Sequence, residues 1–187
     1  MDYKKEIKDY LDLEIQVIKS LDLEEINTVM NVLEEGRKRE CRVYICGNGG
    51  SAATASHYCC DFNKGISEFH DKRYDFICLS DNIPTMLATG NDRGYEEIFV
   101  LPIRNKIKPT DIFIGISGSG NSANVVKAME YANEVGATTI AIVGYDGGKM
   151  KKIATHSIHA NIDNMQISED IHMILDHVMM WVLHNAE

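Results

Sequence analysis

Two segments rich in glycine and serine carry residue types that can bind a phosphate group. Residues 46–51 read CGNGGS, and residues 117–122 read SGSGNS. Glycine allows a positive φ and a close backbone approach, and a following helix offers free N–H groups and the positive end of its dipole. The second segment adds the hydroxyls of Ser117, Ser119 and Ser122 and lacks the lysine of a P-loop. A phosphate monoester site is predicted; the alternative is that both segments are only strand-to-helix turns with helix N-caps.

A histidine and a carboxylate follow the first of these loops. His57 and Asp61 are four residues apart, which places them on one face of a helix. An imidazole and a carboxylate together suit zinc or a similar ion, which polarises a carbonyl as a Lewis acid. The alternative is that the two residues form a surface or core pair without a metal.

Short apolar strands alternate with helices over residues 40–187. The strands are expected at 42–46, 74–79, 111–117, 138–143 and 156–160. The helices are expected at 51–63, 82–88, 123–135, 149–153 and 166–184. This alternation predicts an α/β fold with a doubly wound, five-stranded parallel sheet and flanking helices. Ligands bind such sheets beyond the carboxyl ends of the strands, which is where both loops lie.

Residues 1–39 precede the first strand and contain two runs of helical apolar spacing, at 2–20 and 23–39. We expect these residues to form an N-terminal helical arm that packs against another subunit. Residues 40–187 are then the α/β core of a single domain.

Composition narrows the range of partners. The 187 residues carry a net charge of −9 and show no basic stripe, which argues against nucleic acid or an anionic membrane as the main partner. No apolar stretch approaches the roughly 20 residues of a membrane span, and no apolar signal core follows the charged N-terminus. Five cysteines without a CxxC pair indicate a reducing compartment, so we expect a cytoplasmic protein.

Four segments together resemble the phosphoheptose isomerases, a family built on the SIS (sugar isomerase) domain. They are GNGGSAATASH at 47–57, TGNDRGY at 89–95, GISGSGNSANV at 115–125 and GYDGGKM at 144–150. The resemblance covers nearly the whole chain and implies a single SIS domain. It implies isomerisation of sedoheptulose 7-phosphate to D-glycero-D-manno-heptose 7-phosphate, which supplies heptose to lipopolysaccharide, capsule or other glycans. It also implies zinc, no nucleotide cofactor, and a cytoplasmic homotetramer with sites at subunit interfaces.

The resemblance also implies roles for individual residues. Substrate contacts are expected in the first loop and in the second motif, at Asn48, Gly49, Gly50, Ser51, Asn91 and Asp92. Phosphate contacts are expected at Ser117, Gly118, Ser119 and Ser122. The metal ligands are expected to be His57, Asp61, Glu169 and His177. Asp61, Glu169 and His177 are also the expected catalytic set, and both carboxylates are expected to contact the substrate.

Two of these positions depart from the family pattern. The family usually has Glu where Asp61 stands and Gln where Glu169 stands. The first change shortens a carboxylate and the second adds one, which leaves open a moved base, an altered metal affinity or a related sugar. Gln166 lies three residues before Glu169 and can supply the lost amide.

An aldose–ketose isomerisation moves a proton between C1 and C2 through an enediol, which requires a base and an acid. We expect Asp61 or Glu169 as the base and His177 as the acid. Glu169 and His177 are eight residues apart, about 12 Å along a helix, so either the ligand lies along the helix or neighbouring subunits complete the site. On the same helix, Asp176 is expected to be solvated and His172 to be packed.

Two other functions remain open at this stage. One is an isomerase for a different phosphosugar. The other is a non-catalytic SIS adaptor or sugar-phosphate sensor, which has no need of a histidine at the acid position. The presence of His177, with His57 and Asp61, favours catalysis, whereas the fold alone would not.

Overall fold

The computed structural model describes residues 1–185 of the chain. Within this range, five strands form one parallel sheet in the order β2-β1-β3-β4-β5. Their bounds are Arg42–Cys46 (β1), Asp75–Cys78 (β2), Ile112–Ser117 (β3), Thr138–Val143 (β4) and His156–His159 (β5). The predicted α/β fold is confirmed, with every strand end within one residue of its expected position. Strands β1 and β3 are neighbours, so the loops that follow them meet at the switch point of the sheet.

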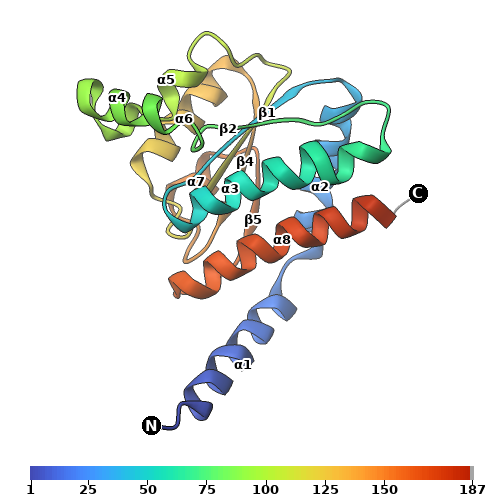
Figure 1. Ribbon diagram of the computed structural model, residues 1–187, viewed down its shortest axis with the longest axis vertical. Coiled ribbons are helices and arrows are strands. Elements are labelled where there is room, and N and C mark those ends of the chain that lie inside the picture. Colours follow the sequence, from blue (N-terminus) through green and yellow to red (C-terminus); the bar gives the residue numbers. More distant parts are fainter. Residues whose placement is uncertain (186–187) are drawn as a thin grey trace.

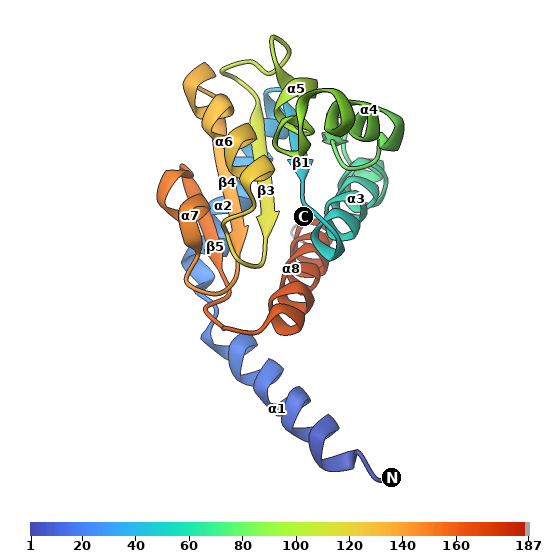
Figure 2. The same cartoon turned by 90° about the vertical axis from the view of Figure 1, so that its left-hand side faces the viewer.

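Helices cover both faces of the sheet (Figures 1 and 2). One face carries α2 (Leu23–Lys38), α3 (Gly50–Cys60) and α8 (Met165–Asn185). The other carries α4 (Ile83–Arg93), α5 (Val100–Ile103), α6 (Ala123–Val135) and α7 (Gly148–Ile153). In the part of the chain that is described, no helix is both long and apolar enough to cross a membrane.

The central strand β3 explains why the sequence reads as a parallel sheet. All of its residues are buried. Ile112, Ile114 and Ile116 pack with the apolar side chains of α2, α3 and α8. Phe113 points to the opposite core, which includes α6. A strand covered on both faces needs apolar residues at every position, and this produces a continuous apolar run instead of alternation.

The helix expected at 51–63 does not continue as a regular α-helix. Helix α3 ends at Cys60 and is followed by a π-helical turn, Asp61–Ile66, and a 3₁₀ turn, Ser67–Phe69. The extra residue in a π turn rotates the side chains that follow it, and such turns are frequent at functional sites. Asp61 therefore stands at the junction between two helical geometries.

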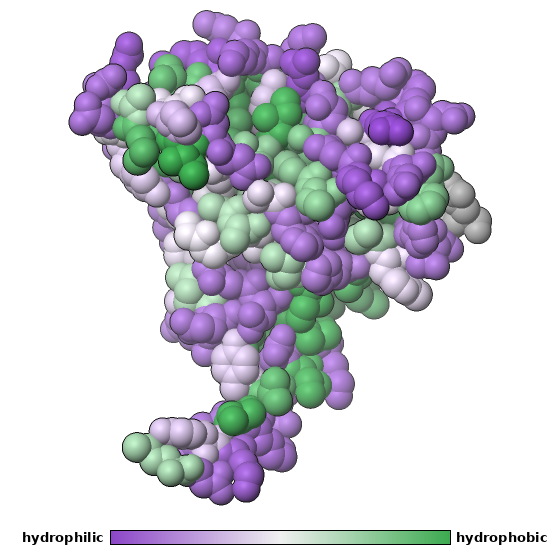
Figure 3. All heavy atoms as spheres, viewed as in Figure 1, coloured by the Kyte–Doolittle hydropathy of each residue, from purple (hydrophilic) through white to green (hydrophobic). Residues whose placement is uncertain are grey.

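The predicted arm divides into two parts. Helix α2 packs against β5 and buries Ile26, Val29 and Leu33, so it belongs to the core. Helix α1 (Lys4–Ser20) projects from the body, and Val17 is its one buried residue (Figure 1). Its exposed apolar residues form a stripe, visible in Figure 3, that consists of Ile7, Leu11, Ile15 and Ile18.

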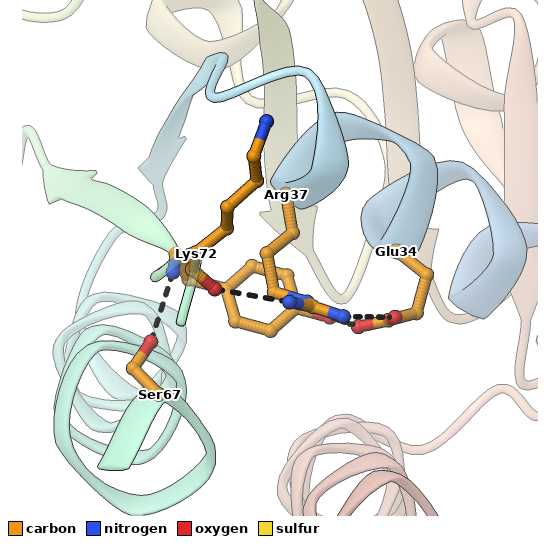
Figure 4. A network of polar contacts seen from close by, with 5 residues as sticks. Glu34, Arg37, Ser67 and Lys72 are labelled. Atoms are coloured by element: carbon orange, nitrogen blue, oxygen red, sulfur yellow. Dashed lines mark hydrogen bonds and ion pairs between the residues drawn. The ribbon is translucent and has the colours of Figure 1, made fainter. Parts of the chain in front are cut away.

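A polar network fixes α2 to the segment before β2 (Figure 4). Arg37 donates to the Glu34 carboxylate at 2.8 Å and to the Lys72 carbonyl at 3.0 Å. The Tyr74 hydroxyl donates to Glu34, and the Tyr74 N–H donates to the Ser67 hydroxyl at 2.8 Å. The Ser67 hydroxyl in turn donates to the Phe62 carbonyl at 2.7 Å. The network thus ties the end of the π turn to α2 and to the segment before β2.

Candidate active site

The loop after β3 is curled by its own side chains. The Ser117 and Ser122 hydroxyl oxygens are 3.0 Å apart, and the Gly120 N–H donates to Ser117 Oγ at 3.1 Å. Gly120 has a φ of +63°, which favours glycine. Among the described residues, no side chain caps the start of α6, which begins directly after Ser122. Hydroxyl groups and a helix N-terminus therefore face the same end of the sheet, as an anion site requires.

A reciprocal amide pair joins the first loop to the second. Asn48 Nδ2 donates to Asn124 Oδ1 at 2.9 Å, and Asn124 Nδ2 donates to Asn48 Oδ1 at 2.8 Å. The Tyr95 hydroxyl also donates to Asn48 Oδ1, at 2.7 Å. Residue-by-residue reasoning assigned no role to Asn124 or Tyr95, although both lie within segments that carried the family resemblance.

The predicted contacts Asn91 and Asp92 lie on the last turn of α4, which extends five residues beyond its expected end at 88. Both side chains are exposed, and Asn91 Nδ2 donates to Asp92 at 2.8 Å. The helix starts as its sequence indicates, because Asn82 caps it by accepting from the Thr85 N–H at 3.1 Å. Asn91 and Asp92 hydrogen-bond to each other and precede Tyr95, which does reach the first loop.

The first turn of α8 closes over both loops. A Cβ atom on Gly50 would lie 2.4 Å from Glu169 Oε2, so the Glu169 carboxylate rests directly against the start of α3. A Cβ atom on Gly118 would lie 2.6 Å from the sulfur of Met165. Both atoms are the far ends of flexible side chains, and their closeness shows that the start of α8 lies against both loops. A carboxylate at a helix N-terminus is electrostatically favourable. Glu169 therefore lies at the edge of the sheet, beside the predicted substrate loop.

A second group of titratable side chains lies farther along α3 and α8. The Nε2 atoms of His57 and His177 are 3.2 Å apart, and His57 Nε2 is 3.5 Å from Asp61 Oδ2 and 4.0 Å from Asp176 Oδ2. One ligand atom from each of the four lies within 4.8 Å of the others. We call these four residues the histidine–aspartate cluster. It contains three of the four predicted metal residues. Glu169 lies two turns earlier on α8 and is not a member.

Asp176 was expected to be solvated, and that expectation was wrong. Its side chain is 0% exposed, because it shares the inward face of α8 with His172 and Met179. Burial, with the Asp61 carboxylate as a smaller cause, raises the pKa of Asp176 to about 8. Within residues 1–185, neither of its carboxylate oxygens has a hydrogen-bond partner. A buried carboxylate in this state is costly unless it is neutral, paired or bound to a metal.

The histidine–aspartate cluster fits a divalent metal ion. Two imidazoles and two carboxylates are ligands that zinc accepts, and zinc bonds of about 2.0–2.1 Å in a tetrahedron put neighbouring ligand atoms about 3.3 Å apart. The separations of 3.2 and 3.5 Å around His57 are close to that value. The unpartnered oxygens of Asp176 supply the remaining negative charge. The residues present therefore fit the ion that the resemblance implies.

His172 is packed, as expected. Its side chain is 1% exposed, between the sheet and the inward face of α8. Burial lowers the pKa of His172 to about 4, so the ring is neutral at physiological pH.

The buried ring of His172 predicts a loss of stability in mild acid. The folded pKa of about 4 lies below the ordinary value of 6.5, so the unfolded chain takes up a proton first as the pH falls. The neutral ring therefore contributes to the free energy of unfolding above pH 6.5, and this contribution is lost on acidification towards pH 4. The loss between pH 7 and pH 5 is about 2 kcal/mol. Urea denaturation in EDTA at both pH values measures it. In a His172→Gln variant, the free energy of unfolding should fall by about 2 kcal/mol less between pH 7 and pH 5 than in the wild type. An equal fall in both proteins would contradict the assignment.

Comparison with known proteins identifies the family of the chain. Residues 2–144 match the model of the SIS domain family. A phosphoheptose isomerase from Helicobacter pylori (strain P12) is 33% identical over 174 residues, which is 92% of this chain and 90% of the relative. A probable phosphoheptose isomerase from Thermoplasma volcanium is 32% identical over 182 residues, which is 95% of this chain and 90% of the relative.

A solved structure of phosphoheptose isomerase from Neisseria gonorrhoeae has the same fold, with a TM-score of 0.89 at 24% identity over 97% of this chain and 98% of that one. The structure from Francisella tularensis gives a TM-score of 0.86 at 23% identity over 98% of both chains. The structures establish the fold, and the family match and the sequence identities extend over most of the chain. On these grounds, the chain belongs to the phosphoheptose isomerases of the SIS domain family.

Proposed function

We propose that this chain isomerises sedoheptulose 7-phosphate to D-glycero-D-manno-heptose 7-phosphate in the cytoplasm and thereby supplies heptose for glycans. The observation that carries the proposal is the serine loop after β3 with the Glu169 carboxylate beside the neighbouring glycine loop. The relatives named phosphoheptose isomerase support the choice of substrate. The five free cysteines support a reducing compartment.

The serine loop would hold the phosphate group of the sugar. Ser117, Ser119 and Ser122 offer hydroxyl donors, and the start of α6 offers N–H groups and the positive end of its dipole. The Asn48–Asn124 pair fixes the distance between this loop and the first loop. A sugar anchored by its phosphate would therefore run towards Asn48 and Gly49, with its reacting carbons beside the start of α3.

We assign the base to Glu169. Its carboxylate lies against Gly50, one turn after Met165, which contacts Gly118 in the serine loop. It thus lies beside the first loop, on the helix whose start contacts the serine loop. Asp61, the other expected base, lies in the histidine–aspartate cluster. In this scheme, Glu169 takes the proton from one carbon and returns it to the next, while the substrate passes through an enediol.

His177 would act as the acid on the sugar oxygens. It stands eight residues after Glu169, about 12 Å farther along α8. Met165, which touches the serine loop, is another turn away in the opposite direction. One protomer therefore brings Glu169, and not His177, beside its own glycine loop. This separation supports an oligomer in which His177 of one protomer reaches the loops of another across a subunit interface, and the family resemblance implies a homotetramer.

The metal would be zinc, held by the histidine–aspartate cluster. When bound, zinc would supply a Lewis acid that polarises the sugar carbonyl, and it would reach the sugar together with His177, across the subunit interface. The protein side chains hold the phosphate and move the proton. No nucleotide cofactor enters this scheme.

The proposal is tested by incubating zinc-replete protein with sedoheptulose 7-phosphate and following the aldose product by NMR. We expect conversion to the heptose 7-phosphate, and no conversion of unphosphorylated sedoheptulose, because the serine loop has nothing to anchor. Fructose 6-phosphate, which has one carbon fewer, tests whether turnover depends on the length of the sugar. Absence of turnover would refute the proposed isomerase activity. Faster turnover of another phosphosugar would assign that sugar as the substrate instead.

A further inference from the structure

We propose that Tyr95 is a positioning residue, whose hydroxyl makes the Asn48 side chain a pure hydrogen-bond donor towards one oxygen of the enediolate that forms during isomerisation. The segment that contains Tyr95 carried the family resemblance, but no role followed for the residue itself. The inference deepens the proposed function and rests on it for the reaction. The state of the Asn48 amide can nevertheless be measured without substrate.

The orientation of the two asparagine amides follows from one backbone group. The Val125 N–H donates to Asn124 Oδ1 at 3.0 Å. This N–H lies in the first turn of α6, where backbone N–H groups have no partner within the helix. Because Asn124 Oδ1 is thus an acceptor, Asn48 must present its Nδ2 group to it, at 2.9 Å. Asn48 Oδ1 then faces Asn124 Nδ2, at 2.8 Å.

Tyr95 uses the last free acceptor position of Asn48. An amide oxygen has two lone pairs, and an amide NH₂ group has two hydrogens. Asn124 Nδ2 donates to one lone pair of Asn48 Oδ1, and the Tyr95 hydroxyl donates to the other, at 2.7 Å. One hydrogen of Asn48 Nδ2 is donated to Asn124. Within residues 1–185, the second N–H of Asn48 is therefore the one group of this amide that is left for a ligand.

The turn that carries Tyr95 is fixed to α6. Gly94 has a φ of +101°, which favours glycine and lets the chain turn from α4 into the 3₁₀ turn η3 (Tyr95–Glu97). Glu97 pairs with Lys127 of α6 at 2.6 Å. The Tyr95 side chain is 62% exposed, so its ring contributes little to the core. Removal of its hydroxyl should therefore change the bond to the first loop and leave the fold intact.

A fixed donor suits an oxygen that gains negative charge. In the proposed reaction, Glu169 takes a proton from one carbon, the C–H electron pair forms the carbon–carbon double bond, and the carbonyl π pair moves to the oxygen. Return of the proton to the neighbouring carbon reverses these shifts at the second oxygen, so each oxygen carries charge in turn. His177 would serve one oxygen and the Asn48 N–H the other. Asn48 lies two residues before Gly50, against which Glu169 rests, so donor and base lie at the same loop.

The test begins with Tyr95→Phe, which removes only the hydroxyl. A donor that binds the enediolate more tightly than the substrate raises kcat and leaves KM nearly unchanged. The kcat for sedoheptulose 7-phosphate should therefore fall about 3–10-fold, the effect of one neutral hydrogen bond, with KM within about 2-fold of the wild type. Tyr131→Phe is the matched control on α6. The Tyr131 hydroxyl accepts from the Asn105 N–H at 2.9 Å, and its loss should leave kcat and KM at wild-type values.

A double-mutant cycle tests whether Tyr95 acts through Asn48. In an Asn48→Ala background, Tyr95→Phe should lower kcat by less than about 2-fold, because no amide is left to position. A second readout needs no substrate. In protein labelled with nitrogen-15 at its asparagine side chains, Tyr95→Phe should shift the NMR signals of the Asn48 amide, and Tyr131→Phe should not. The Asn48 signals are identified by their loss in Asn48→Ala.

Four results would overturn the inference. They are a wild-type kcat in Tyr95→Phe, a rise in KM without a fall in kcat, an equal loss of kcat in the Asn48→Ala background, and an Asn48 amide signal that Tyr95→Phe does not shift. Failure of the proposed function looks different. A wild type that turns over no phosphosugar would refute the isomerase, whereas a shifted amide signal in Tyr95→Phe would still support the positioning of Asn48.

Discussion

Replacing His177 with asparagine is expected to lower the kcat for sedoheptulose 7-phosphate by about 10²–10⁴-fold, the usual contribution of a general acid or base. Asparagine is polar and of similar size, but it cannot donate a proton at neutral pH. The change also removes one ring of the pair at 3.2 Å from His57, and with it a ligand of the proposed zinc site. Steady-state kinetics by NMR measures the effect.

The matched control is His184→Asn. His184 is also on α8 and exposed, and its ring packs on Phe69, away from the cluster. That variant should keep wild-type kcat. In His177→Asn, binding of inorganic phosphate should be retained, because the serine loop is unchanged. Full turnover by His177→Asn, or equal losses in both variants, would refute the role of His177.

Replacing Gly120 with alanine is expected to abolish productive binding of the phosphosugar and to destabilise the fold. Gly120 has a φ of +63°, and a Cβ atom there would lie 2.1 Å from the carbonyl oxygen of Gly147. Neither the left-handed backbone nor the contact with a backbone oxygen can be relieved by a rotamer change. Strain of this kind costs about 1–3 kcal/mol for the dihedral alone, so a loss of at least 2 kcal/mol in unfolding free energy is expected.

Urea denaturation measures the stability of this variant, and isothermal titration with inorganic phosphate measures the site. Gly90→Ala is the control. Gly90 lies inside α4, and a Cβ atom there would make an ordinary contact of 3.8 Å with Ile98. That substitution should leave the unfolding free energy unchanged or raise it by about 0.5–1 kcal/mol. A Gly120→Ala protein with wild-type stability and phosphate affinity would show that the loop is not constrained as described.

Much of the fold follows from local patterns. Strand β3 is apolar at every position, and this indicates burial on both faces without any knowledge of the rest of the chain. The loops at 46–51 and 117–122 could be placed together because β1 and β3 each end in one of them. Parallel strands end at the same edge of a sheet.

Other features could not be read locally. The apolar residues of α2 predict an amphipathic helix, but only the folded chain shows that it packs on β5. Helical periodicity does not indicate the π turn at Asp61, in which the Ser67 hydroxyl donates to the Phe62 carbonyl at 2.7 Å. Periodicity did contain one missed signal. Asp176 follows His172 by four residues, so a packed histidine at 172 implies an inward-facing position at 176.

The link between Asn48 and Asn124 makes the enzyme vulnerable to chemical ageing. Asn124 Oδ1 also accepts from the N–H of Val125 at 3.0 Å, which fixes the orientation of its amide. Asn48 must therefore present an NH₂ group to that oxygen, and hydrolysis to aspartate would set two acceptor atoms against each other. Because Asn48 is followed by Gly49, no side chain on the next residue shields its amide. Deamidation of Asn48 would break the link between the two loops that hold the sugar. Intact-mass spectrometry and turnover measurements on the same sample would detect the deamidation and the accompanying loss of activity.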